Sequence, residues 1–444
     1  METMENNLNL PVVIIGAGPV GMAAAAHLTK RNIPFLLFEA GNNVGTSVAS
    51  WEHIKVFSPW KYNIDKAAKE LLLQTHWIEP EPDQLHTGRE FIDRYLVPLS
   101  QLPIINHSIH TNSKVIAIGK KGLDKMKNAN RDTLPFLVRV KQGTSIHSFE
   151  ARAVIDASGT WLMPNPLGSG GNFAIGETEN SQQIFYGIPG VLSKFKWRYA
   201  NKNIAVVGGG HSAINTILEL EKLKQEFPQT EINWILRKHQ VSDVYGGKED
   251  DALEARGQLG IRIERLISED RINVYTPFEI SEIRKVNESL VLIGEQYGRK
   301  KQLPGVDEII ANTGSRPDFS FLREVRLSIS NSIESVDALA ELIDPNIHSC
   351  GTIRPHGEKE LQHPDKGFYI AGSKSYGRAP TFLMATGYEQ VRSIAAAIDG
   401  DMEAAQKTEL ELPETGVCSS GINGNSCCGA SSVTQEPKKT ACCG

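Results

Sequence analysis

The chain has 444 residues, with 47 Lys and Arg against 52 Asp and Glu. This length is sufficient for two or three domains with sizeable cores. The slightly acidic balance, without any basic arm, argues against nucleic acid or an acidic membrane surface as the main partner. No basic segment precedes an apolar core at the N-terminus, and glycine and proline interrupt the apolar stretch 11–28. The sequence therefore predicts no secretory signal and no membrane span, and a cytoplasmic protein.

Residues 11–28 have the pattern of a strand, a glycine turn and a helix. Residues 12–15 are apolar and β-branched, as a buried parallel strand requires, and residues 22–28 are rich in helix-forming alanine. Gly16 permits a tight turn, Gly18 lets a pyrophosphate approach the backbone, and Gly21 lets the helix pack close to the strand. The phosphates would lie at the helix N-terminus. The predicted dinucleotide-binding residues of this turn are Gly16, Ala17, Gly18, Pro19 and Gly21.

A second strand, residues 33–38, ends at Glu39. The distance of Glu39 from the glycines suits a carboxylate that binds the ribose hydroxyls of adenosine. The aromatic segment 56–63 that follows is expected to run back toward this cofactor. For Trp51 and Trp60, packing of the rings over the first sheet is the favoured interpretation.

The next segments predict a helix around 88–99 and strands over 114–119, 136–141 and 153–156, with a hairpin excursion at 120–133. The last of these strands ends in small residues, and Ser158 and Gly159 there let the backbone crowd a ligand. Residues 161–171 are rich in proline and glycine, which indicates an interdomain linker.

A second fingerprint follows a strand that ends at Val207. Gly208, Gly210 and Ala213 occupy its three positions, and a helix over 214–223 follows. Two such motifs in one chain, each framed by strand and helix, are a strong signal. The predicted contacts of this turn are Gly208, Gly210, His211, Ser212 and Ala213.

The strand 231–236 ends in Arg237 and Lys238, where the first domain has Glu39. A carboxylate there would repel a 2′-phosphate, whereas a guanidinium can hold one with paired hydrogen bonds. The first domain therefore suits FAD and the second suits NADPH. A solvated strand end without a ligand is the alternative for Arg237.

Three further segments carry predicted contacts. The segment 308–317 is an apolar strand that ends in small residues, with Thr313 and Gly314 expected to contact NADPH. The short strand 367–373 ends in Gly372 and Ser373, and a helix over 381–398 carries Thr386 and Gly387 at its start. A helix start aimed at the flavin would stabilise negative charge on the reduced ring. The predicted FAD contacts of these two segments are Gly372, Ser373, Thr386 and Gly387.

The order of these motifs resembles the flavoproteins with two dinucleotide-binding domains, which include flavin-containing monooxygenases and thioredoxin reductases. The motifs are the first fingerprint, DASGT, the second fingerprint, ANTGSRP and GFYIAGS. The resemblance implies an α/β fold with two Rossmann-like domains, the NADPH domain being inserted in the FAD domain. The expected boundaries are 10–165 and 305–400 for FAD, 195–304 for NADPH, and a disordered tail over 413–444.

A narrower resemblance is to the flavin-binding monooxygenases of arsenic-resistance gene clusters. It rests on SPWKYN, IHSCGTIRPHG, YGRAPTFLMATGYEQVRS and LPETGVC. The chain departs from its wider relatives in lacking both the CxxC of thioredoxin reductases and the FxGxxxHxxx(W/F) signature of the monooxygenases. Ser373 also stands where many relatives place an aspartate on the flavin ribitol, although a serine can still donate or accept there.

The cysteines are unevenly placed, because only Cys350 lies outside the last 27 residues. The tail is poor in apolar residues, which predicts disorder. Its adjacent thiols suit a soft metal or metalloid better than structural disulfides, and an oxidisable tail without function is the alternative. The loop histidines at 348, 356 and 363 and Cys350 have no zinc-ligand spacing, which favours packing. The predicted metalloid ligands are Cys418, Cys427, Cys428, Cys442 and Cys443.

These features predict an NADPH-dependent FAD oxidoreductase, monooxygenase-like, in arsenical or related soft-metalloid detoxification. The cofactors carry the chemistry, so no acid or base residue is assigned from the sequence. The alternatives are a reductase of thiol-bound metal or metalloid and a flavin-bearing metalloid carrier without turnover. The expected partners are a small-molecule or metalloid substrate and oxygen, and a homodimer is left open.

Overall fold

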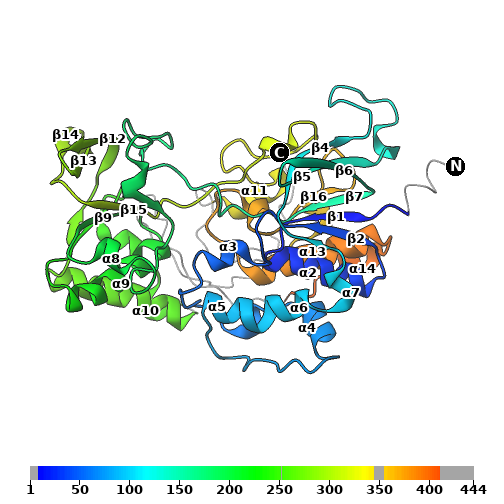
Figure 1. Ribbon diagram of the computed structural model, residues 1–444, viewed down its shortest axis with the longest axis horizontal. Coiled ribbons are helices and arrows are strands. Elements are labelled where there is room, and N and C mark those ends of the chain that lie inside the picture. Colours follow the sequence, from blue (N-terminus) through cyan, green and yellow to red (C-terminus); the bar gives the residue numbers. More distant parts are fainter. Residues whose placement is uncertain (1–8, 252, 345–354, 411–444) are drawn as a thin grey trace, which may run out of the picture.

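The structure is a computed structural model that describes residues 9–251, 253–344 and 355–410. Figure 1 shows two units side by side, joined by extended segments of the chain. Each unit is built around a five-stranded parallel sheet, and each also carries a three-stranded antiparallel sheet. This confirms the predicted α/β fold with two Rossmann-like units.

The first sheet has the strand order β16-β7-β1-β2-β3. Its strands, all parallel, are β16 (Phe368–Ile370), β7 (Ala153–Asp156), β1 (Val12–Ile15), β2 (Phe35–Phe38) and β3 (Ile109–His110). The central strand β1 is buried at all four positions, so its apolar run is explained by burial on both faces.

The second sheet repeats this plan in the order β11-β10-β9-β15-β8. Its parallel strands are β11 (Asn273–Tyr275), β10 (Glu231–Ile235), β9 (Asn203–Val207), β15 (Glu308–Ala311) and β8 (Ile184–Tyr186). In this sheet β9 has the place of β1 and β15 has the place of β7. Both glycine turns therefore leave the centre of a parallel sheet at its carboxyl edge.

The membership of β15 corrects the expected domain boundaries. The sequence placed residues 305–400 in the first domain and began the second at residue 195, but β15 pairs with β9 and β8. The second unit thus includes strands on either side of the expected range 195–304. An apolar strand ending in small residues fits either sheet, and only the pairing decides between them.

The antiparallel sheets pack on one face of each parallel sheet. They consist of β4 (Ser113–Lys120), β5 (Phe136–Gln142) and β6 (Ser145–Ala151) in the first unit, and β12 (Glu279–Val286), β13 (Ser289–Gln296) and β14 (Arg299–Gln302) in the second. The predicted hairpin excursion between residues 119 and 136 is confirmed by the antiparallel pairing of β4 with β5.

The helix α2 (Pro19–Lys30) is buried against the first sheet and packs on α13 (Met384–Ile398) (Figure 1). Residues 23–26 are four alanines that are fully buried. Their small side chains allow both neighbours to approach the helix backbone closely. α9 (His211–Glu226) and α10 (Glu254–Ser268) provide the corresponding helical layer of the second unit.

The other helices are short. They are α3 (Thr46–Ala49), α4 (Lys66–Leu72), α5 (Gly88–Phe91), α6 (Val97–Ser100), α7 (Pro103–Asn106), α8 (Lys196–Tyr199), α11 (Asp337–Ile343), α12 (Glu358–Leu361) and α14 (Met402–Gln406). A π-helical stretch, Ile92–Leu96, joins α5 to α6, so the helix predicted around 88–99 is confirmed. Short 3₁₀ turns cover Trp60–Tyr62, Arg131–Thr133, Ser181–Gln183, Val241–Val244, Lys248–Asp250, Ser320–Leu322 and Gly372–Tyr376.

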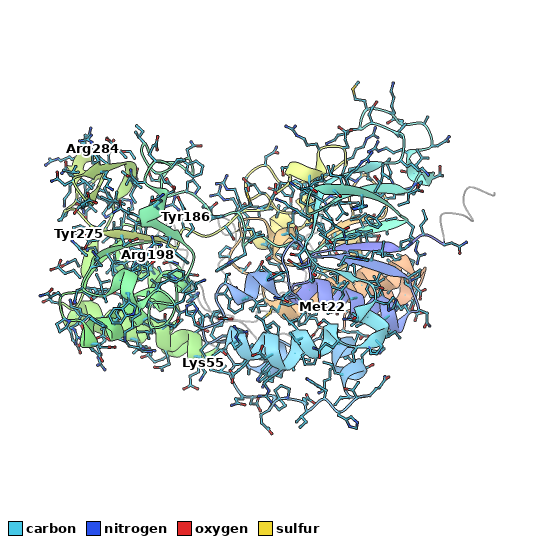
Figure 2. The ribbon with its side chains drawn as sticks, viewed as in Figure 1. Met22, Lys55, Tyr186, Arg198, Tyr275 and Arg284 are labelled. Atoms are coloured by element: carbon cyan, nitrogen blue, oxygen red, sulfur yellow. The ribbon has the colours of Figure 1, made fainter. Side chains whose placement is uncertain are left out.

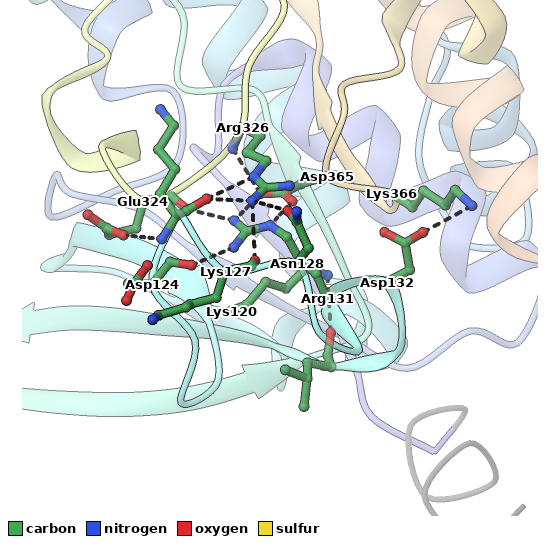
Figure 3. A network of polar contacts seen from close by, with 12 residues as sticks. Lys120, Asp124, Lys127, Asn128, Arg131, Asp132, Glu324, Arg326, Asp365 and Lys366 are labelled. Atoms are coloured by element: carbon green, nitrogen blue, oxygen red, sulfur yellow. Dashed lines mark hydrogen bonds and ion pairs between the residues drawn. The ribbon is translucent and has the colours of Figure 1, made fainter.

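A buried ion pair fixes the connection between β4 and β5 to the segment before β16 (Figure 3). Arg131 donates to both carboxylate oxygens of Asp365, from Nε at 2.6 Å and from Nη2 at 2.8 Å. The Arg326 backbone N–H donates to the same carboxylate. Burial acts to raise the pKa of Asp365, but the hydrogen bonds from Arg131 and Arg326 outweigh it and lower that pKa. The carboxylate is therefore held in its charged form.

We expect Arg131→Met to lower the free energy of unfolding by about 3–5 kcal/mol, because it leaves the Asp365 carboxylate buried without its cation. Chemical denaturation of the purified proteins measures this change. Asp132→Asn is the matched control, since it breaks the exposed pair that Asp132 forms with Lys366 at 3.2 Å and should cost under about 1 kcal/mol. Equal losses of unfolding free energy in the two variants would contradict the conclusion that Arg131 neutralises a buried charge on Asp365.

Candidate functional site

The three fingerprint glycines of the first turn have three different surroundings. Gly16 has a φ of +94°, and a Cβ there would lie 2.9 Å from the Ala157 carbonyl oxygen. At Gly21 a Cβ would lie 1.9 Å from the Gly16 carbonyl oxygen, so only glycine lets α2 pack onto the turn. At Gly18 a Cβ would meet nothing within 4 Å. Gly16 and Gly21 are thus required by the fold, whereas Gly18 borders open space.

The N-terminus of α2 at this open space has the properties of an anion site. Gly18 is the N-cap residue and offers no side chain to the free N–H groups, and Pro19 occupies the first helical turn. The first turn contains no acidic residue that would neutralise the positive end of the helix dipole. A pyrophosphate therefore fits the chemistry of this position.

Glu39 lies beside the same turn, at the end of β2. Its Oε2 accepts a hydrogen bond from the Ala17 N–H at 2.7 Å, and its Oε1 accepts one from the Gly41 N–H at 2.7 Å. A carboxylate offers about four acceptor positions, so two remain for ribose hydroxyls. The backbone bonds fix the orientation of the carboxylate before any ligand arrives.

The other predicted FAD contacts meet at this edge of the first sheet. Ser158 and Gly159 follow β7, and Gly372 and Ser373 follow β16. A Cβ at Gly159 would lie 3.5 Å from the Ser373 Oγ, so the ends of these two strands are in contact. The structure thus brings four residues from two distant segments to one place.

Thr386 and Gly387 lie in the first turn of α13, where both are buried. A Cβ at Gly387 would lie 2.6 Å from Val20 Cγ2 and 2.9 Å from Phe382 Cζ. The absence of a side chain at Gly387 is therefore accounted for by the packing of α13 against α2. Contact of this turn with a flavin stays a prediction.

A buried ion pair that the sequence analysis missed lies beside Ser158, one of the predicted FAD contacts. Lys374 and Asp156 are both fully buried, with 2.6 Å between Lys374 Nζ and Asp156 Oδ2. Lys374 Nζ also donates to the Asp318 carbonyl at 2.7 Å and to Ser158 Oγ at 3.2 Å. The neighbouring motif residues Ser158 and Ser373 were the only signal of this pair in the sequence.

The second turn repeats the geometry of the first. Gly208 has a φ of +134°, and a Cβ there would lie 2.2 Å from the Asn312 carbonyl oxygen. Gly210 is the N-cap of α9 and borders open space, since a Cβ there would meet nothing within 4 Å. The first turn of α9 also lacks acidic residues. Ala213 is fully buried against the turn, as the third fingerprint position requires.

A cavity of about 680 Å³ lies in front of this second turn, a volume in the range of small-molecule sites. Segments of both units line it, because residues 377–380 of the first unit, residues 165–168 and 171, and the second fingerprint all border it. Seven of the predicted NADPH contacts line this cavity: Gly208, Gly210, Ser212, Arg237, Lys238, Thr313 and Gly314.

His211 and Ala213 do not line the cavity. The His211 ring lies 5.6 Å from the ring of Phe57 in the aromatic segment of the first unit. Burial lowers the pKa of His211, and the nearby Arg256 charge lowers it further. A neutral imidazole that packs between the units is the role that this geometry supports.

The aromatic segment packs in the first unit through Trp60 and contacts the second unit through Phe57, a contact that the sequence analysis did not predict. Trp60 is fully buried and stacks on His86 with 3.9 Å between the ring centroids, which confirms the packing interpretation. Phe57 instead reaches the second unit. His53 also faces that unit, with 3.9 Å between its Nε2 and Glu219 Oε2 of α9. Burial raises the pKa of Glu219 to about 7 and lowers that of His53.

The predicted metalloid ligands, Cys418, Cys427, Cys428, Cys442 and Cys443, lie outside the described residues, as do His348 and Cys350. In the part of the chain that the structure describes, no group of His, Cys, Asp and Glu could hold a metal ion. His356 hydrogen-bonds to Gln390, and His363 Nδ1 accepts from the Ser328 N–H, in keeping with packing. Over residues 9–251, 253–344 and 355–410, no helix is long and apolar enough to span a membrane.

Known proteins similar to this chain include two curated reductases. A ferredoxin–NADP reductase of Lactiplantibacillus plantarum is 25% identical over 387 residues, which cover 86% of this chain and 95% of the relative. Another, from Lactococcus lactis subsp. cremoris, is 23% identical over 415 residues, which cover 93% and 99%. The NADPH expected from the sequence agrees with the NADP in the names of these relatives.

Solved structures share the fold at lower identity. A bacillithiol disulfide reductase of Bacillus cereus has a TM-score of 0.64 at 18% identity, covering 88% of this chain and 99% of its own. An FAD-bound cadaverine monooxygenase of Erwinia amylovora has a TM-score of 0.61 at 13% identity, covering 92% and 99%. Residues 13–341 match the family model described as pyridine nucleotide-disulphide oxidoreductase. Because this match spans more than half of the sequence, the chain belongs to the pyridine nucleotide-disulphide oxidoreductase family and is an oxidoreductase.

Proposed function

We propose that this oxidoreductase uses NADPH to reduce FAD, and that the reduced flavin passes its electrons to oxygen in a monooxygenase-like reaction. The observation that carries the proposal is the cavity shared by the two units. A dinucleotide on the second turn would lie against residues 377–380, which begin four residues after the predicted FAD contact Ser373. This placement supports hydride transfer across the boundary between the units.

The residues of each turn fit the group assigned to them. Gly18 and the free end of α2 would hold the FAD pyrophosphate, and Glu39 would hold the ribose. Gly210 and the free end of α9 would hold the NADPH pyrophosphate, with Arg237 and Lys238 at the 2′-phosphate. When bound, FAD accepts a hydride from NADPH and delivers two electrons to an acceptor.

The acceptor is proposed from the cysteine pattern and the resemblance. The chain has no CxxC, and the described residues contain no cysteine. Transfer from the flavin to a dithiol of the thioredoxin reductase type is therefore unsupported, which favours oxygen or a bound acceptor. The arsenical or soft-metalloid substrate rests on the narrower resemblance and on the thiol pairs at 427–428 and 442–443. Those pairs also support the second candidate, a reductase of thiol-bound metalloid.

We expect Gly18→Val to give a folded protein without FAD, and Gly210→Val to give a folded yellow protein with a raised KM for NADPH. A Cβ at either position would meet no protein atom within 4 Å, so a side chain there would enter the space assigned to a pyrophosphate. Absorbance spectra and circular dichroism of the purified variants measure flavin content and fold. Each variant controls for the other, and full flavin in Gly18→Val would refute the assignment of the first turn.

We expect a preference for NADPH over NADH that Arg237→Ala reduces about ten- to a hundredfold, mainly through KM for NADPH. A charge-assisted hydrogen bond contributes about 1.5–3 kcal/mol, which corresponds to that range. Steady-state kinetics with both nucleotides measure the effect. Equal parameters for NADH and NADPH in the parent enzyme would rule out a 2′-phosphate site.

The acceptor is tested by following NADPH, oxygen and hydrogen peroxide with and without arsenite or methylarsenite. A monooxygenase should consume one NADPH and one oxygen for each oxidised product, and its substrate should suppress peroxide release. A reductase would instead consume NADPH without oxygen when thiol-bound metalloid is supplied. If the purified protein does not consume NADPH steadily, only the flavin-bearing metalloid carrier without turnover remains.

The same assay on a chain truncated after Pro413 tests the tail. Flavin content and basal NADPH oxidation should persist, whereas metalloid binding and metalloid-stimulated turnover should fall, because neighbouring thiolates chelate soft ions. If the truncated protein binds arsenite as tightly as the full chain, the tail is not the capture site.

A further inference from the structure

A buried carboxylate holds both ends of a loop that borders the cavity in front of the second glycine turn. Glu177 is 1% exposed. Its Oε1 accepts from the Leu167 N–H at 2.9 Å, and its Oε2 accepts from the Ala174 N–H at 2.8 Å. One side chain thus fastens the start and the end of residues 167–174, the loop that we call the cavity loop.

A third donor completes the surroundings of this carboxylate. The Tyr186 hydroxyl, at the end of β8, donates to Glu177 Oε1. Figure 2 shows Tyr186 on the side of the second unit that faces the first. Burial, together with this hydrogen bond, raises the pKa of Tyr186 above its ordinary value, so the phenol keeps the proton that it donates. A carboxylate with three donors is well suited to its buried position.

The cavity loop in turn holds the guanidinium assigned to the 2′-phosphate. Arg237 Nη1 donates to the Ser169 carbonyl oxygen at 2.8 Å, and Ser169 lies inside the loop. The Ser169 N–H donates to the Ile280 carbonyl at 3.0 Å, which fixes its position from the other side. Arg237 is otherwise exposed, and a free arginine side chain loses rotamer entropy when it is ordered.

From these contacts, and resting on the proposed NADPH function, we infer that Glu177 is a positioning residue for recognition of the 2′-phosphate. Glu177 does not line the cavity, so it acts through the loop and not by touching the nucleotide. Its carboxylate sets the place of the Ser169 carbonyl, and that carbonyl orients Arg237. Four of the five N–H donors of the guanidinium remain for a phosphate.

Glu177→Gln tests the inference with little change in shape. An amide has one acceptor oxygen and places an NH₂ group against one of the two loop N–H groups, which frees one end of the loop. We expect about tenfold weaker binding of 2′,5′-ADP, a matching rise in KM for NADPH, and unchanged flavin content, binding of 5′-AMP and kcat. Glu179→Gln is the matched control, because Glu179 is exposed two residues further on and loses the same charge.

The path through Arg237 is tested by combining the variants. In an Arg237→Ala background, Glu177→Gln should weaken 2′,5′-ADP binding by less than about twofold, because the guanidinium that it positions is gone. An equal loss in both backgrounds, or equal losses for 2′,5′-ADP and 5′-AMP, would overturn the inference. So would parent-like binding by Glu177→Gln.

Two further measurements keep the result interpretable. If Glu177→Gln does not fold, Tyr186→Phe keeps both loop bonds but removes the third donor, and it should weaken 2′,5′-ADP binding about two- to threefold without affecting 5′-AMP. No selective effect there would also refute the inference. If the parent itself binds 2′,5′-ADP no more tightly than 5′-AMP, the proposed use of NADPH fails, which is a separate outcome.

Discussion

The ammonium group of Lys374 is the point on which the arrangement of the two units depends. It is fully buried, and its three partners come from the outgoing segment, through Asp156 and Ser158, and from the returning segment, through the Asp318 carbonyl. A buried cation is tolerated only where it is fully paired. Both links to the second unit are therefore fixed at one atom at the edge of the first sheet. The ends of β7 and β16, which carry the predicted FAD contacts, meet at the same place.

The glycine turns of the two parallel sheets have the same geometry, and the two units differ in the residue that follows the second strand of each motif. In each, the first glycine lies against a neighbouring strand end and the second borders open space at an uncapped helix N-terminus. These features suit an anion of any identity. In the proposed assignment, the two nucleotides are distinguished at one position after the second strand of each motif, which is Glu39 in one unit and Arg237 in the other. Arg237 is exposed and depends on the cavity loop for its orientation, whereas backbone N–H groups hold Glu39 directly.

Much of the fold and of the candidate site could be predicted from the sequence, because short-range rules determine them. The runs 12–15 and 203–207 are strands and the glycine turns are where the spacing placed them. What could not be predicted depends on pairing at long range. The strand β6 is polar and mostly exposed, so it has no periodic apolar signal, and β15 gives no sign of which sheet it joins. His211 fits the fingerprint but packs on Phe57. Glu177 has no distinctive sequence pattern, because its three hydrogen-bond donors come together only in the folded chain.

The order of the strands along the chain has a consequence for synthesis on the ribosome. The second unit is continuous between β8 and β15, so all strands of its sheet are available once residue 311 has emerged. The first unit lacks β16 and α13 until residue 398, and without them one side of β7 and the alanine-rich face of α2 stay exposed to water. Since domains fold as units during translation, the inserted unit completes its sheet before the unit that surrounds it. The nascent first half therefore carries an uncovered apolar helix and an open strand edge while about 240 further residues are synthesised. This exposed surface is the part of the nascent chain that a chaperone would bind.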